Sequence, residues 1–204
     1  ELVVGMDARL SNLSLQALEE WRVEDKVFDI YTQSKVKPWN KKNFTMVDST
    51  EMAMNYVREA VSKGKRVAVV SELDRKGKGA TLETLKDYIE EQTGKKGWAL
   101  DQANKNDDEA KRYIDKLGWT DKGIYMMGEL EKDLKKGTIT HMWASPVIQS
   151  AWSYKSEECP FDLVVGLYPN SVLTAPNIVQ HISRFRTSTE FVMYVNQQKR
   201  FRPF

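Results

Sequence analysis

Short apolar runs alternate with longer amphipathic stretches along most of the chain. The apolar runs predict β-strands at residues 2–6, 27–32, 44–47, 66–71, 97–100, 138–144, 162–167 and 190–195. Several of these runs are continuous and β-branched, which is typical of parallel strands buried on both faces. Because amphipathic helices are predicted between the strands, the pattern indicates an α/β fold in which a mainly parallel sheet is flanked by helices.

The amphipathic stretches predict helices at residues 14–21, 50–62, 81–91, 107–117, 130–136 and 175–185. The helix at 50–62 has the clearest pattern. Ser49 or Thr50 can cap its start, and Gly64 can end it. We expect its apolar face to be formed by Met52, Tyr56, Val57 and Val61.

The segment 35–43, KVKPWNKKN, is polar and contains proline, which is typical of an exposed linker. We expect it to separate residues 1–34, the end of a first domain or a connecting segment, from a main domain at residues 44–204. The chain opens on Glu1 inside an apolar stretch, with neither an initiator methionine nor a signal-peptide pattern. We therefore expect it to be part of a longer protein whose N-terminal part precedes Glu1.

The composition is that of a globular protein, because 41% of the 204 residues are hydrophobic and 29% are charged. No apolar run approaches the roughly 18 residues of a membrane span. One cysteine, Cys159, cannot form an internal disulfide, and two histidines, His141 and His181, are too few for a zinc-type ligand set. We expect no metal site and a reducing location, either the cytoplasm or the nucleus or viral replication site of a host cell.

The net charge of +2 is too small to indicate a nucleic-acid partner by itself, although lysines and arginines cluster in predicted loops at 63–66, 75–78 and 199–202. One of these loops, DRKGKGA at 74–80, joins the strand ending at Ser71 to the next helix, a position that favours phosphate binding. Its KGKGA ending lacks the Gly-Lys-Ser/Thr order of a P-loop. This favours a plain turn or a loop that contacts a nucleic-acid backbone.

Hydroxyl and aromatic side chains follow the predicted strand at 138–144. The hydroxyls belong to Ser145, Ser150 and Ser153, and the rings to Trp152 and Tyr154. Hydroxyls at the carboxyl ends of parallel strands suit phosphate contacts, and aromatic faces allow bases to stack. The alternative is that Trp143 and Trp152 belong to the hydrophobic core.

A third group of polar residues lies on the predicted helix at 175–185, after the buried run FDLVVGLY. Gln180 and Arg184 are four residues apart and are expected to share a helix face, with Arg186 just beyond. Guanidinium groups gathered in this way need anionic partners. These partners are either a phosphate or, if the arginines lie on an ordinary surface, neighbouring Asp and Glu side chains.

The order of these segments resembles a known family. SPVIQSAWS, FDLVVGLYP and QHISRFR resemble the C-terminal motifs of superfamily 2 helicases, most closely those of the herpesvirus origin-binding protein and related plasmid and phage replication helicases. ELVVGMDARL resembles the end of that family's first RecA-like domain, and RVAVVSEL the opening strand of its second. In two departures, Ala151 stands where the family has glycine, and Arg186 follows Arg184 at a spacing unlike the Arg-x-x-Arg of other superfamily 2 helicases.

The resemblance implies a RecA-like three-layer domain, the second half of an ATP-dependent DNA helicase. ATP and Mg²⁺ would be bound mainly by an N-terminal RecA-like domain of the same protein. Arg184 and Arg186 would act as arginine fingers, and Gln180 would bind near the γ-phosphate or the attacking water. Single-stranded or forked DNA would be held by Ser71, Ser145, Ser150, Ser153 and Trp152, and a primase or other replication protein is a candidate partner.

Three other functions remain open at this point. A translocase could use the same motifs without separating strands. A non-enzymatic module could bind nucleic acid without ATP. A doubly wound enzyme for small molecules is the least favoured, since the sequence has no glycine fingerprint, nucleophile elbow or suitably placed carboxylate pair.

Overall fold

A computed structural model describes residues 41–73, 81–101, 107–114, 128–146, 154–170 and 173–196. The chain divides into two compact units, Glu1–Asn40 and Lys41–Phe204, and all described residues belong to the second. The strands predicted at 2–6 and 27–32, the helix predicted at 14–21 and most of the predicted linker lie outside the described residues. The predicted domain boundaries therefore stay a prediction.

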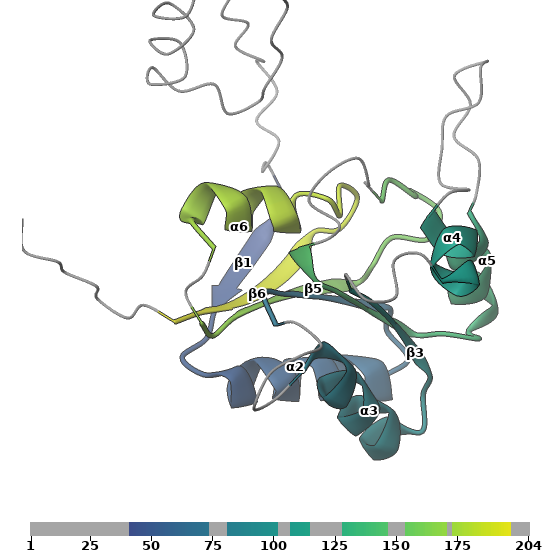
Figure 1. The fold of residues 1–204 in the computed structure, drawn as a ribbon, viewed down its shortest axis with the longest axis horizontal. Helices are drawn as coiled ribbons and strands as arrows, with labels where there is room; N and C mark the ends of the chain where they lie inside the picture. Colours follow the sequence, from purple (N-terminus) through teal and green to yellow (C-terminus); the bar gives the residue numbers. More distant parts are fainter. Residues whose placement is uncertain are drawn as a thin grey trace, which may run out of the picture. The chain divides into compact units, whose positions relative to one another are not determined.

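Six strands form one sheet within the described residues (Figure 1). They are β1 (Asn43–Met46), β2 (Val67–Ser71), β3 (Gly97–Leu100), β4 (His141–Ala144), β5 (Leu163–Tyr168) and β6 (Glu190–Val195), in the spatial order β1-β6-β5-β2-β4-β3. Every pairing between these strands is parallel. The predicted α/β class with a parallel sheet is thereby confirmed.

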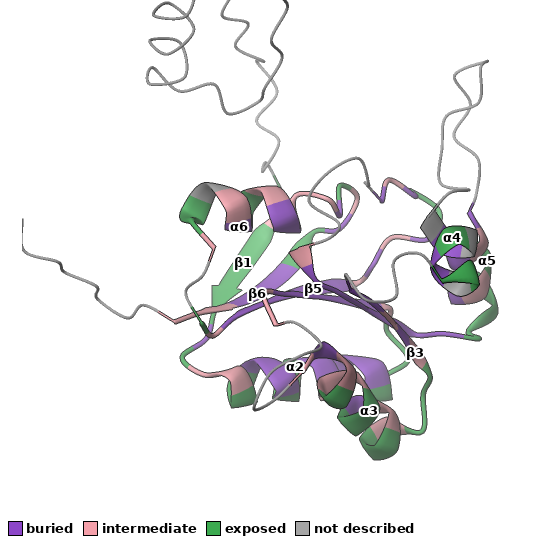
Figure 2. Cartoon of the chain, in the orientation of Figure 1, coloured by how far each residue is buried: buried purple, intermediate pink, exposed green. Residues whose placement is uncertain are grey.

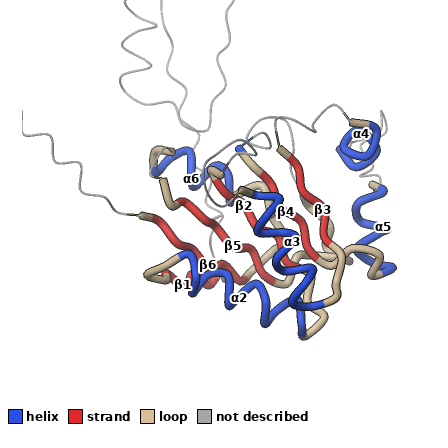
Figure 3. The backbone as a smooth tube through the Cα atoms, turned by 60° about the horizontal axis from the view of Figure 1, so that its bottom comes forward, coloured by secondary structure: helices blue, strands red, loops and turns tan. Residues whose placement is uncertain are grey.

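Five helices connect the described strands: α2 (Thr50–Ser62), α3 (Leu82–Thr93), α4 (Asp108–Ile114), α5 (Glu129–Lys136) and α6 (Ala175–Ile182). Helices α2 and α3 cover one face of the sheet, whereas α6 and the pair α4 and α5 lie on the other (Figures 1 and 3). Helices therefore flank the sheet on both faces. None of the helices described here is long and apolar enough to cross a membrane.

The central strands β2, β4 and β5 are buried along their whole length, as their continuous apolar sequences predict (Figure 2). The edge strand β1 is exposed at all four positions. A hydrophobic core cluster lies between the sheet and helices α2 and α3, and it includes Trp143 of β4, Leu82 and Ile89 of α3, and Val57 and Val61 of α2. Trp143 is fully buried, which settles its assignment to the core.

The caps of helix α2 agree with the prediction, and its buried face agrees in part, since Val57 and Val61 are buried as predicted. Ser49 Oγ accepts the N–H of Met52 at 3.1 Å, and Gly64 adopts a φ of +75° just beyond the helix. Met52 and Tyr56, predicted to face the core, are 45% and 43% exposed. Ala53, Met54 and Ala60 complete the buried face beside Val57 and Val61. The two alanines allow the helix to approach the sheet closely, whereas the prediction followed only the large apolar residues.

Gly97 on β3 leaves room for the imidazole of His141, its partner on β4. A Cβ atom at Gly97 would lie 2.1 Å from Nδ1 and Cε1 of that ring. The ring cannot easily move, because its Nδ1 accepts the indole N–H of Trp143 at 2.7 Å. We expect Gly97→Ala to lower the free energy of unfolding by about 2 to 3 kcal/mol, through overpacking and the strained hydrogen bond. Urea denaturation measures this loss.

A double-mutant cycle with His141→Ala is the control. Removing the ring should make Gly97→Ala nearly neutral, so the two substitutions should be strongly non-additive. Additive losses would show that the clash is not the cause.

Candidate functional site

Helix α6 begins at a loop that is attached to the end of β2. Thr174 has an extended backbone at the N-cap, and Pro176 lies in the first turn, where a missing N–H costs nothing. The carboxylate of Glu72, next after β2, accepts the backbone N–H of Asn170 and, at 3.2 Å, that of Leu173. The entry to α6 is thus connected to the carboxyl end of β2.

Helix α6 ends at Ile182, so the prediction that it extends to 185 is wrong by three residues. The hydroxyl of Ser183 donates to the carbonyl oxygen of Gln180 at 2.8 Å. If the helix continued, the same carbonyl would accept the backbone N–H of Arg184, so the Ser183 hydroxyl competes with helix extension. Gln180 remains in the last helical turn and is half-buried, but Arg184 lies in the turn beyond the helix and is half-buried too. Arg186 follows in the same turn and is exposed. We call residues 183–187 the arginine turn.

Phe185 anchors the arginine turn to the body of the domain. Its side chain is fully buried and meets the ring of Phe161 edge-on, with the ring centroids 5.4 Å apart. The backbone at Phe185 also pairs with Tyr154: Tyr154 N–H donates to Arg184 O at 2.8 Å, and Arg186 N–H donates to Tyr154 O at 3.0 Å. The two arginines therefore flank a residue that is fixed by both packing and backbone hydrogen bonds.

Lys42 fixes the far side of the same turn. Its ammonium group donates to Arg186 O at 3.0 Å and to Ser188 O at 2.6 Å, and it lies 5.0 Å from the ring centroid of Phe191. Burial lowers the pKa of Lys42. The preceding residue, Lys41, has a φ of +66°, an uncommon conformation for a residue with a Cβ atom. The chain therefore enters β1 through a defined bend that is attached to the arginine turn.

His181 joins α6 to the carboxyl ends of two strands. Its Nε2 lies 3.2 Å from the carbonyl oxygen of Ser145, just past β4, and its Nδ1 lies 3.2 Å from the hydroxyl of Tyr168, the last residue of β5. A carbonyl can only accept, so Nε2 carries the proton and Tyr168 donates to Nδ1. Burial, with a further contribution from the positive charge of Arg184, lowers the pKa of His181 to about 4. The imidazole is therefore neutral at pH 7.

This low pKa makes the stability of the domain depend on pH. Between its ordinary pKa of about 6.5 and its folded value, His181 binds a proton more readily in the unfolded chain, so stability falls as the pH drops through this range. We expect a loss of about 2 kcal/mol between pH 7 and pH 5. Urea denaturation of the wild-type chain and of His181→Gln at both pH values measures it.

Between pH 7 and pH 5, the free energy of unfolding of His181→Gln should fall by about 2 kcal/mol less than that of the wild type. His141, whose pKa is also lowered by burial, is present in both proteins and cancels in the comparison. Identical pH dependence in the two proteins would contradict the assignment.

Two of the serines predicted to contact nucleic acid lie where the parallel sheet predicts, at the carboxyl ends of β2 and β4. Both are buried. Ser71 Oγ donates to Leu167 O at 2.9 Å and accepts the N–H of Leu73 at 3.1 Å, so in this structure it shapes the turn after β2. Ser145 presents its carbonyl to His181. Contact of either serine with nucleic acid stays a proposal. The other predicted contacts, Ser150, Trp152 and Ser153, lie outside the described residues.

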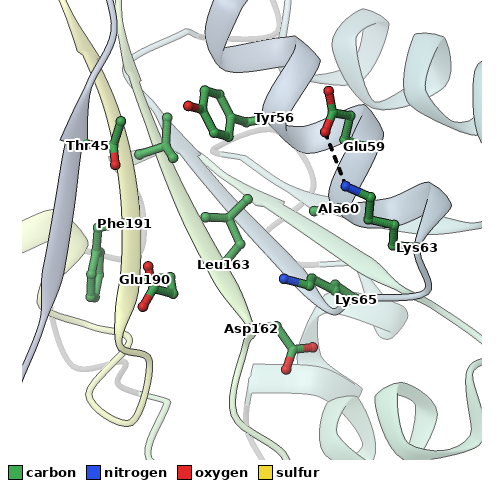
Figure 4. A pocket seen from close by; sticks show the side chains of 11 residues that line it. Thr45, Tyr56, Glu59, Ala60, Lys63, Lys65, Asp162, Leu163, Glu190 and Phe191 are labelled. Atoms are coloured by element: carbon green, nitrogen blue, oxygen red, sulfur yellow. Dashed lines mark hydrogen bonds and ion pairs between the residues drawn. The ribbon is translucent and has the colours of Figure 1, made fainter.

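A surface hollow of about 270 Å³ lies beside α2, at the amino ends of β5 and β6 (Figure 4). It is lined by α2 and by the starts of β5 and β6, among others by Tyr56, Leu163 and Phe191. Its charged residues include Lys63 and Glu59, whose side chains pair with each other at 3.3 Å. Ligands of open parallel sheets bind at the carboxyl ends of the strands. We therefore assign no ligand to this hollow.

Sequence reasoning missed the residues that hold the arginine turn. The sequence indicates His181 only as one of two histidines, which are too few for a zinc site, and Lys42 only as part of the predicted linker. Neither residue belongs to a pattern that indicates its role, because both act through contacts with residues far away in the sequence, 36 positions for His181 and 144 for Lys42. The motif QHISRFR contains His181 but does not indicate which groups its side chain contacts.

No family model matches the chain, and no curated protein matches it significantly. Solved structures with a similar arrangement include the NS3-like helicase from Alongshan virus (10% identity, TM-score 0.44) and the Hef helicase domain from Pyrococcus furiosus (13%, 0.39). A third is the DUF1998 helicase MrfA bound to DNA and AMPPNP (14%, 0.37). They cover 76%, 70% and 76% of this chain, which spans 37%, 25% and 20% of their respective lengths.

Proposed function

We propose that this domain is the second RecA-like half of an ATP-dependent nucleic-acid helicase, acting in DNA replication. Arg184 and Arg186 would reach the γ-phosphate of ATP bound by a P-loop domain of the same protein, and Gln180 would bind beside it. Bound ATP with Mg²⁺ supplies the phosphoryl transfer. The part of this domain is to place positive charge where negative charge develops.

The observation that carries the proposal is the fixed arginine turn. An arginine finger accelerates phosphoryl transfer only if its guanidinium is held in place before the reaction, since reorganisation would consume the gain. Here Phe185 between the arginines is buried, Tyr154 pairs with its backbone and Lys42 binds the carbonyl of Arg186. These contacts fix the backbone from which both arginine side chains extend. The order of the motifs around the turn supports the finer assignment to the origin-binding and plasmid replication group.

The described residues fit a domain that contributes to an ATP site without forming it alone. Guanidinium groups supply donors for phosphate, whereas no cluster of three or more His, Cys, Asp or Glu side chains in the described part of the chain could hold a metal ion. Mg²⁺ and the phosphates are proposed to be held mainly by the other half, because the motifs around the arginine turn resemble only the second half of a helicase.

Strand displacement by the full-length protein tests the proposal. We expect ATP-dependent unwinding of forked DNA by the full-length protein, and neither ATP turnover nor unwinding by these 204 residues alone. ATP-driven movement on single-stranded DNA without strand separation would identify a translocase instead. Nucleic-acid binding that is indifferent to nucleotide in the full-length protein would identify a binding module. DNA-stimulated ATP turnover by the isolated chain would contradict the division of the site between two halves.

A further inference from the structure

The stretch between Arg186 and strand β6 is attached to two residues at the start of the domain. The ammonium group of Lys42 donates to the carbonyl oxygens of Arg186 and Ser188, at 3.0 and 2.6 Å. The backbone N–H of Asn43 donates to the carbonyl oxygen of Thr189 at 2.7 Å. The side chain of Lys42 therefore supplies two of the three hydrogen bonds that hold this stretch against the start of β1.

The side chains of the stretch itself give it little polar support. The hydroxyl oxygens of Thr187 and Ser188 are buried and have no hydrogen-bond partner among the described residues. A buried hydroxyl without a partner lowers stability. The hydrogen bonds from Lys42 have a charged donor and are stronger than neutral ones, and the ring of Phe191 faces the ammonium group with its centroid at 5.0 Å. Lys42 thus stabilises a backbone conformation that is unfavourable by itself.

Arg186 depends on this attachment more than Arg184 does. Arg186 is exposed and Arg184 is half-buried, so the direction of the Arg186 side chain is set mainly by its backbone. The N–H of Arg186 donates to Tyr154 O at 3.0 Å, and its carbonyl accepts from Lys42. The carbonyl of Arg184 accepts the N–H of Tyr154 at 2.8 Å instead. Loss of the Lys42 ammonium would therefore release the peptide group after Arg186 and leave the hydrogen bonds to Tyr154 in place.

The strand pairing next to Lys42 has its own support. Strand β1 pairs with β6 in register from Asn43 and Glu190 to Met46 and Met193. The side-chain amide of Asn43 also donates to the carboxylate of Glu190 at 2.7 Å. Because these contacts do not involve Lys42, we expect the domain to fold when Lys42 is replaced.

We propose that Lys42 is a positioning residue that fixes the direction in which Arg186 leaves the arginine turn. The inference rests on the proposed function, because it requires Arg186 to reach the γ-phosphate. Lys42 touches neither ATP nor the reacting atoms in this scheme, and it acts through the carbonyl of Arg186. It lies in sequence directly after the unit Glu1–Asn40 and Lys41, outside the helicase-like motifs. A residue far from the motif thus determines how well one of its arginines works.

The first test is the kinetics of DNA-stimulated ATP hydrolysis by full-length Lys42→Met, which keeps an unbranched side chain but removes the charge and the N–H donors. We expect kcat to fall about 10-fold, since a displacement of about an ångström can cost up to about 100-fold. The KM for ATP should stay within about twofold, as for an interaction made only in the transition state. Lys41→Met removes the same charge from the exposed neighbouring residue and should leave both constants unchanged.

The second test repeats the substitution in an Arg186→Ala background. If Lys42 acts through Arg186, Lys42→Met should lower kcat by less than about twofold in this background, because the two substitutions remove the same interaction. A merely structural effect would lower kcat by the same factor in both backgrounds. Far-UV circular dichroism and thermal unfolding show whether the variants are folded at the assay temperature.

Two results would overturn the inference: wild-type kcat in folded Lys42→Met, or an equal fall of kcat with and without the Arg186 side chain. If Lys42→Met does not fold, Lys42→Gln decides by the same comparison, because its side chain is uncharged and one bond shorter. Wild-type turnover in Arg186→Ala would also overturn the inference, since Lys42 would then have no arginine to act through. A wild-type protein that does not hydrolyse ATP would instead show that the proposed function itself is wrong.

Discussion

Replacing Arg184 by alanine in the full-length protein is expected to lower kcat for DNA-stimulated ATP hydrolysis about 1,000-fold, the lower end of the range for arginine fingers. The KM for ATP should change by less than about threefold, because in the proposed function the P-loop of another domain would supply most of the binding energy. Steady-state ATP turnover at saturating DNA measures both constants. Arg184→Lys should recover little of the loss, since an ammonium group lacks the planar fork of a guanidinium.

The same measurement on Arg186→Ala shows which arginine contacts the γ-phosphate. Arg184 is half-buried and Arg186 is exposed, so we expect the larger loss at Arg184. Arg58 is a matched control, because it is also half-buried. It belongs to α2, the helix that lies on the other face of the sheet from α6 (Figure 1). Arg58→Ala should leave ATP turnover unchanged. A double variant of Arg184 and Arg186 with turnover near that of the wild type would exclude the arginine-finger role.

Phe185→Ala is expected to lower the free energy of unfolding by about 4 kcal/mol. The ring is fully buried against Phe161, so the substitution removes its transfer free energy and leaves a cavity. Urea denaturation of the 204-residue chain measures the loss. Because the arginine turn loses its anchor, ATP turnover of the full-length variant should also fall, even at temperatures where the protein is folded.

Two control variants show whether the effect of Phe185→Ala comes from the loss of buried packing. Phe185→Leu keeps most of the buried volume and should cost less than about 1.5 kcal/mol, with ATP turnover largely retained. Val179→Ala on α6 changes a side chain that is 46% exposed and should cost less than about 0.5 kcal/mol. If Phe185→Ala were no more destabilising than Val179→Ala, the turn would not be anchored as described.

The secondary structure of the described residues could largely be predicted because it depends on local patterns. Short apolar runs identified all six described strands, most clearly β2 and β5, which are buried along their whole length. The cap at Ser49 and the glycine at 64 follow from the backbone groups that a helix end leaves without partners. The α/β class follows from the alternation of these elements alone.

The contacts that build the candidate site could not be predicted in this way. The end of α6 is set by the hydroxyl of Ser183, which could equally have continued the helix. The pairing of Tyr154 with Phe185 joins two segments 31 residues apart, and no periodicity marks either of them. Residues that hold other residues in place carry no motif, so His181 and Lys42 become visible only when the chain is folded.

The pairing of β1 with β6 has a consequence for the biosynthesis of the domain. Asn43 and Glu190 lie side by side but are 147 residues apart in sequence, and within the described sheet β1 pairs with β6 alone. At ordinary elongation rates, the ribosome synthesises β1 roughly 7 to 30 s before it synthesises the partner strand β6. During this interval Lys42 has neither Arg186 nor Ser188 to bind. The arginine turn is therefore among the last parts of the nascent domain to acquire its final form, and a chain that ended before β6 would lack the strand beside which Lys42 and this turn are held.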